Sequence, residues 1–133
     1  MQQSMSEGYA VPKRGLWVVD DSLAFRLIVQ QVFGRAGWSV TEFSNLNSAL
    51  AALAVSPAAD VVLLDIHLPD GNGLDRVADF GKHGLAVVVV SNLVRAEQTR
   101  RAFAAGAVDI ITKPVNVSVL MARVERAAGA AEG

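Results

Sequence analysis

Residues 61–65 join four consecutive bulky aliphatic side chains to a carboxylate, Asp65. An apolar run of this length, without polar alternation, is typical of a strand buried on both faces of a parallel sheet. Pro69, Asp70 and Gly71 follow closely, and these residue types favour a turn. We therefore expect the chain to leave a central strand at Asp65, where open α/β sheets bind their ligands.

Strand and helix patterns alternate along the whole chain. Strands are predicted at 16–19, 38–43, 61–65, 86–90 and 108–112. Helices are predicted from Ser22 to Gly37, from Asn45 or Asn47 to a point before Pro57, and over 73–80, 95–105 and 117–128. Right-handed crossovers between successive strands then give a doubly wound α/β fold, a five-stranded parallel sheet with helices on both faces.

The chain has the size of a single domain, with 133 residues. We expect a flexible lead at 1–14, the folded domain at 15–128 and a frayed tail at 129–133. No apolar run reaches the length of a membrane span, and the absence of cysteine fits a cytoplasmic protein. A net charge of −1 gives no electrostatic case for direct binding to nucleic acid.

Polar residues follow four of the five predicted strands. These residues are Asp20 and Asp21 after the first strand, Asp65 after the third, Ser91 after the fourth and Lys113 after the fifth. All carboxyl ends of a parallel sheet open at one edge, so these side chains should meet there. Three gathered carboxylates repel one another, and one would be protonated unless a cation lies among them. No histidine or cysteine cluster accompanies these carboxylates, so the expected cation is a hard one that prefers oxygen ligands, Mg²⁺ or Mn²⁺.

A hydroxyl and an ammonium at the same edge indicate an anionic second ligand. Lys113 would neutralise a phosphoryl oxygen, and Ser91 would donate a hydrogen bond to another. Asp65 is then the candidate nucleophile, because a carboxylate is ionised at neutral pH and forms an acyl phosphate. Taken singly, each residue also has a plain structural explanation, such as a solvated strand end, a helix cap or a surface lysine at a turn.

Several motifs make the chain resemble the receiver domain of two-component response regulators from residue 16 to residue 128. They are Val19-Asp20-Asp21-Ser22, the segment 64–73, Ser91, Gly106-Ala107-Val108-Asp109 and Thr112-Lys113-Pro114. The resemblance implies a flavodoxin-like fold with strand order 2-1-3-4-5. It implies that Asp65 is the phosphoacceptor and that Asp20, Asp21, Asp65 and the backbone carbonyl of His67 hold the metal. It further implies that Ser91 is the switch hydroxyl and that the Lys113–Pro114 bond is cis.

The sequence departs from the family pattern at three positions. Ile110 stands where the family usually has Tyr or Phe, so the usual inward turn of an aromatic ring cannot operate. Asn92 follows the switch hydroxyl where a small residue is usual, and its amide either narrows access to Asp65 or bonds a phosphoryl oxygen. His67 is either a solvated loop residue or an influence on the hydrolytic water.

The leading hypothesis is a phosphorylation-controlled switch in a two-component phosphorelay, not an enzyme with a separate substrate. Its phosphodonor would be a sensor histidine kinase or a histidine phosphotransfer protein, and its output an altered protein–protein contact with an unidentified partner or effector domain. We expect a monomer or weak dimer. One alternative is a receiver-like scaffold that binds proteins without phosphorylation. Another is a phosphatase or phosphotransferase for a small molecule, which the short chain leaves little room to build.

Overall fold

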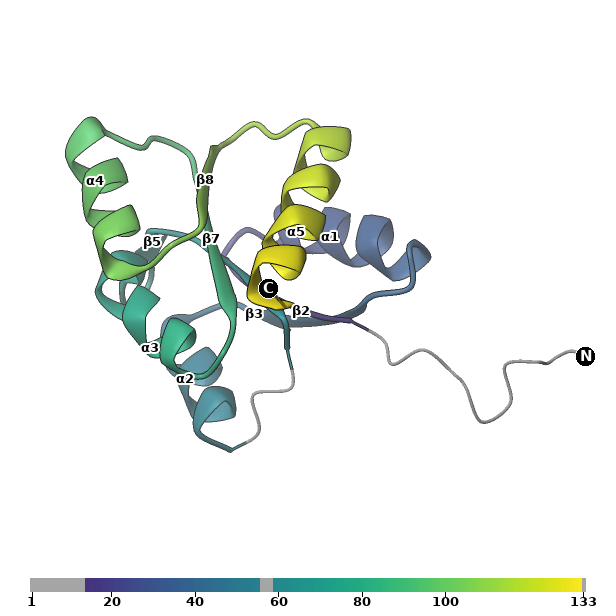
Figure 1. Cartoon of the computed structure of the whole chain (residues 1–133), viewed down its shortest axis with the longest axis horizontal. Helices are drawn as coiled ribbons and strands as arrows, with labels where there is room; N and C mark the ends of the chain where they lie inside the picture. The colour runs from purple at the N-terminus through teal and green to yellow at the C-terminus, as the bar shows by residue number, and fades with distance from the viewer. Residues whose placement is uncertain (1–13, 56–58, 133) are drawn as a thin grey trace, which may run out of the picture.

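A five-stranded parallel sheet forms the centre of the molecule in the computed structural model, which describes residues 14–55 and 59–132 (Figure 1). Its strands run in the order β3-β2-β4-β7-β8. Their bounds are β2 (Gly15–Val19), β3 (Ser39–Phe43), β4 (Val61–Leu64), β7 (Ala86–Ser91) and β8 (Asp109–Thr112). In chain order this arrangement is 2-1-3-4-5, so the predicted fold is confirmed.

Helices cover both faces of the sheet. The bounds are α1 (Leu23–Arg35), α2 (Leu46–Val55), α3 (Val77–Lys82), α4 (Ala96–Ala105) and α5 (Val117–Glu132). Figure 1 shows α1 and α5 together on one face and α2, α3 and α4 on the other. This is the alternation of strands and helices that the sequence predicts.

The central strand β4 and its neighbour β7 supply buried side chains to both faces of the sheet. In β4, Val61 and Leu63 pack in the core beneath α1 and α5, whereas Val62 and Leu64 pack beneath the other three helices. All four residues are buried, as are the six residues of β7. Successive side chains of a strand point to opposite faces, so burial on both faces requires an unbroken aliphatic run.

The connection after β4 contains more structure than the sequence indicates. Strands β5 (His67–Leu68) and β6 (Gly71–Asn72) form a small antiparallel pair. A 3-10 helix, η1 (Gly73–Arg76), then precedes α3, so the helix predicted over 73–80 is divided. The side chain of Asn72 accepts a hydrogen bond from the Leu74 N–H at 2.8 Å and caps η1. This local cap favours a tight turn before the α-helix begins.

The C-terminal end of the domain differs from the sequence prediction of a frayed tail at 129–133. Helix α5 runs to Glu132, so the predicted helix end at residue 128 was four residues short. Alanine has the highest intrinsic helix propensity, and the alanine-rich end sustains the helix. The predicted lead lies outside the described residues except for Arg14. Among the described residues, no helix combines the length and the apolarity needed to cross a membrane.

Candidate functional site

The three aspartates predicted at the sheet edge form one acidic cluster. Carboxylate oxygens of Asp20, Asp21 and Asp65 lie within 4.8 Å of one another. Asp20 and Asp65 follow the adjacent strands β2 and β4, and the Asp65 N–H donates to the Val19 carbonyl at 3.0 Å. Asp20 and Asp65 are buried and Asp21 is exposed, so the cluster opens to solvent on one side.

The chemistry of this cluster fits a divalent cation. Burial raises the pKa of Asp20 above its ordinary value, although the hydrogen bond from Lys113 acts in the opposite direction. Three neighbouring carboxylates repel one another, and a cation among them relieves that repulsion. All three side chains offer hard oxygen atoms, the ligands that Mg²⁺ and Mn²⁺ take. The acidic residues are those of a typical divalent metal site.

Lys113 joins the same cluster from the end of β8. Its Nζ donates to Asp20 Oδ2 at 2.7 Å and lies 4.5 Å from the centre of the Phe25 ring. The sequence places Lys113 against a phosphoryl group on Asp65, but in the structure its ion-pair partner is Asp20. The Lys113–Pro114 bond is cis, as the resemblance implies. The ammonium is held by one carboxylate and one aromatic face.

Ser91 supplies the hydroxyl of the site. It is the last residue of β7 and is buried. Its Oγ donates to Asp65 Oδ1 at 2.6 Å, and the His67 N–H approaches the same oxygen at the longer distance of 3.4 Å. In the part of the chain that the structure describes, both hydrogen bonds to the Asp65 carboxylate fall on Oδ1. Oδ2 of Asp65 accepts neither of them.

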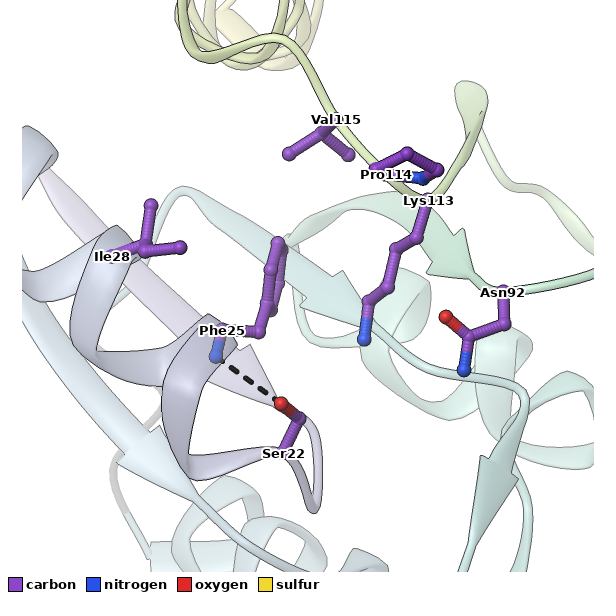
Figure 2. Close-up of a pocket in the computed structure, with 7 residues that line it drawn as sticks. All are labelled: Ser22, Phe25, Ile28, Asn92, Lys113, Pro114 and Val115. Atoms are coloured by element: carbon purple, nitrogen blue, oxygen red, sulfur yellow. Dashed lines mark hydrogen bonds between the residues drawn. The ribbon is translucent and has the colours of Figure 1, made fainter.

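A pocket of about 390 Å³ lies beside Lys113 (Figure 2). Its lining comes from the start of α1 and from the loops after β7 and β8: Ser22, Phe25, Ile28, Asn92, Lys113, Pro114 and Val115. Figure 2 shows the Lys113 side chain between the ring of Phe25 and the amide of Asn92. The exposed Asn92 thus stands at the rim of the site.

The family of the chain follows from its match to a family model. The model for the response regulator receiver domain matches residues 16–125. The chain belongs to this family. The receiver is 35% identical over 118 residues to the DNA-binding transcriptional regulator NtrC of Salmonella typhimurium, a match that covers 86% of the receiver and 25% of NtrC. It thus spans about a quarter of the length of that relative.

Solved structures show the same fold. A CheY-like receiver domain protein from Methanospirillum hungatei superposes with a TM-score of 0.86 at 24% identity, covering 91% of this receiver and 98% of that chain. The BeF3-activated DrrB receiver domain superposes with a TM-score of 0.78 at 30% identity, covering 87% and 97% of the two chains. These likenesses support the topology in Figure 1.

Two residues singled out from the sequence lie outside the acidic cluster of the receiver. Ile110 is half-buried against the core beneath α2, α3 and α4, and its carbonyl accepts a hydrogen bond from Arg123 at 3.3 Å. The His67 side chain is exposed and lines a second pocket together with Leu93 and Arg95. The role of the His67 carbonyl as a metal ligand stays a prediction.

Two further residues make contacts that were missed in the sequence, Arg26 with the acidic cluster and Asp70 with the start of α2. Arg26 of α1 donates from Nη1 to the Asp20 carbonyl at 2.7 Å. Asp70 accepts hydrogen bonds from the N–H groups of Leu46 and Asn47, both at 2.8 Å. Arg26 carries a weak signal, since it falls one helical turn after Ser22, whereas Asp70 reads only as a turn residue.

Proposed function

We propose that this receiver is a phosphorylation-controlled switch in which Asp65 accepts a phosphoryl group from a histidine of a sensor kinase or phosphotransfer protein. The observation that carries the proposal is the environment of Asp65. Its carboxylate accepts a hydrogen bond from Ser91 Oγ at 2.6 Å. A carboxylate oxygen of Asp65 also lies within 4.8 Å of carboxylate oxygens of Asp20 and Asp21. Lys113 Nζ lies at the same cluster, 2.7 Å from Asp20.

The transfer is a displacement at phosphorus. An Asp65 oxygen attacks the phosphoryl group, the bond between phosphorus and the donor's imidazole nitrogen breaks, and the released imidazole takes up a proton from solvent. Mg²⁺ or Mn²⁺, held by Asp20, Asp21 and Asp65, would neutralise charge on the phosphoryl oxygens. Lys113 and Ser91 contribute an ammonium and a hydroxyl to those oxygens. The nucleophile in this step is a carboxylate oxygen, so the transfer needs no general base.

The switch reverses by hydrolysis of the acyl phosphate. Water attacks phosphorus, the Asp65 carboxylate leaves, and inorganic phosphate is released. The receiver therefore catalyses a reaction on itself and turns over no separate substrate. BeF3 activation of the similar DrrB receiver and the regulatory role named for NtrC support a switch that alters contacts with an effector domain or partner protein.

The test is phosphorylation by acetyl phosphate, followed by intact mass. We expect wild type to gain the mass of one phosphoryl group only when Mg²⁺ is present. Asp65→Asn should gain none, whereas Asp75→Asn, which changes an exposed aspartate of η1, should behave as wild type. A wild type unmodified by acetyl phosphate and by a phosphorylated histidine kinase would contradict the proposal.

A constitutive scaffold is the second candidate function, and Ile110 is the observation that favours it. The half-buried aliphatic side chain offers no aromatic ring to turn inward behind Ser91. If the receiver is a constitutive scaffold, wild type and the Asp65→Asn variant would bind its output protein with equal affinity. Equal partner affinity of phosphorylated and unphosphorylated wild type would favour the scaffold over the switch.

A further inference from the structure

The short connection between β2 and α1 carries two of the three acidic residues, and its backbone needs partners outside the regular elements. β2 ends at Val19 and α1 begins at Leu23. The Asp20 N–H donates to the Phe43 carbonyl of β3 at 3.0 Å. The Asp20 carbonyl belongs to the peptide group that joins Asp20 to Asp21. Buried backbone carbonyls require a hydrogen-bond donor, and here a side chain supplies it.

That donor is Arg26, which makes two contacts in different directions. Nη1 donates to the Asp20 carbonyl at 2.7 Å, and Nε donates to Glu42 Oε1 on β3 at 3.1 Å. The Arg26 side chain is only 13% exposed. The rigid, planar guanidinium thus ties the peptide between the two aspartates to an ion pair with the neighbouring strand.

We propose that Arg26 is a positioning residue for the divalent metal site, because it fixes the peptide plane between Asp20 and Asp21. Rotation of this peptide would change the angle between the two successive carboxylates. The proposal rests on the proposed function in one respect, since it assumes that the acidic cluster binds Mg²⁺. It assigns the effect of Arg26 on Mg²⁺ affinity to its contact with the Asp20 carbonyl rather than to its charge.

Loss of the Arg26 charge and loss of its contact with the Asp20 carbonyl should change Mg²⁺ affinity in opposite directions. A cation beside three carboxylates repels Mg²⁺, so loss of its charge alone should tighten Mg²⁺ binding. Loss of the carbonyl contact frees the Asp20–Asp21 peptide and should weaken binding. The sign of the change in Mg²⁺ affinity therefore separates the two causes.

The experiment measures Mg²⁺ binding to the unphosphorylated protein by calorimetry in wild type, Arg26→Met and Glu42→Gln. We expect the Mg²⁺ Kd of Arg26→Met to rise at least fivefold. Glu42→Gln breaks the ion pair but leaves the contact with the Asp20 carbonyl, and its Kd should stay within twofold of wild type. Phosphorylation of Arg26→Met by acetyl phosphate should recover as Mg²⁺ approaches saturation.

Several results would overturn the proposal. They are an Arg26→Met Kd equal to or lower than that of wild type, an equal rise in Glu42→Gln, or a wild type that binds no Mg²⁺. If Arg26→Met fails to fold, as judged by circular dichroism, Arg26→Leu, which also lacks a donor, takes its place with the same expectations. Phosphorylation of wild type tests the proposed function separately, so the Arg26 proposal can fail while that function stands.

Discussion

Two contacts hold the Lys113 side chain in place at the edge of the acidic cluster. Its side chain is 11% exposed, and its ammonium contacts the Asp20 carboxylate and the face of the Phe25 ring. A long, flexible lysine stem has many rotamers, so an ordered ammonium requires contacts that restrict it. Phe25 is in the first turn of α1, where Ser22 Oγ accepts its N–H at 3.2 Å. The cap thus places the ring beneath the lysine.

Replacing Phe25 with leucine should slow phosphorylation more than it destabilises the fold. Leucine keeps the apolar volume, and such exchanges usually cost less than about 1.5 kcal/mol of stability. The lost cation–π contact is worth about 1 kcal/mol, which corresponds to about a fivefold lower rate with acetyl phosphate.

Phe33→Leu is the matched control, since Phe33 is buried in the same helix but contacts Trp38 instead of the lysine. We expect this variant to lose similar stability and keep the wild-type rate. Equal rates for Phe25→Leu and wild type would contradict the role given to the ring.

Asp70 stabilises α2 from a distant loop. Its two carboxylate oxygens accept the N–H groups of Leu46 and Asn47, which have no helical partners at the start of α2. Those hydrogen bonds lower the pKa of Asp70, the one from the Leu46 N–H most of all. The ionised carboxylate is therefore the form that supports the helix.

Asp70→Ala should lower Tm in a pH-dependent manner. A folded-state pKa below the unfolded value makes the stabilisation fully present above about pH 4, the ordinary pKa of aspartate, and lost as pH falls through the lowered folded value. We expect the Tm difference from wild type to be constant near neutrality and to shrink in acid. Glu125→Ala, an exposed change on α5, should show no such trend. A Tm difference that is independent of pH would refute the assignment to the carboxylate.

At the scale of elements, the connection after β4 packs directly on Asp65, the proposed phosphoacceptor. Gly73 begins η1 and donates its N–H to the Ile66 carbonyl at 2.7 Å. A Cβ at Gly73 would lie 2.0 Å from the backbone oxygen of Asp65 and 3.2 Å from Leu64 Cγ. Only glycine lets the backbone approach the Asp65 carbonyl this closely.

Gly73→Ala should destabilise the domain by about 1–3 kcal/mol, the usual range for overpacking, and should also reduce phosphorylation of Asp65. Denaturant unfolding and the acetyl phosphate assay measure the two effects. Gly34→Ala in α1 is the control, because a Cβ there meets nothing within 4 Å. It should stabilise the helix by up to about 1 kcal/mol. A Gly73→Ala variant with wild-type stability would show that the connection after β4 can move to accommodate a Cβ, and would contradict the need for glycine at this position.

The elements differ in how well the sequence predicts them. β4 was predicted because burial on both faces leaves an unbroken aliphatic run. The pair β5 and β6 was not, since strands of two residues are too short to show a period. The cap of α2 by Asp70 spans 24 residues, and no local pattern reveals a contact at that separation. The acidic cluster was predicted because topology alone brings strand ends together. The pairing of Lys113 with Asp20 depends on side-chain geometry.

At the scale of the whole molecule, Mg²⁺ should stabilise the fold. A ligand that binds only the native state at about 100 times its Kd adds about 2.7 kcal/mol of stability. We expect Tm to rise with added Mg²⁺ and to return after chelation with EDTA. Asp21→Asn should remove most of the rise, whereas Glu125→Gln should keep it. An unchanged Tm for wild type in excess Mg²⁺ would argue against a metal site.

Strands β4 and β7 are buried on both faces of the sheet, so we expect the residues of the site to differ in mobility. Asp65 directly follows β4 and Ser91 ends β7, and every residue of these two strands is buried, so their amides should exchange slowly with deuterated solvent. Asn92 and Lys113 lie in the loops that follow. Binding of a phosphoryl group should therefore change amide exchange in these loops and leave the central strands as they were. The proposed switch would then act through a redistribution of loop conformations beside a sheet that keeps its structure.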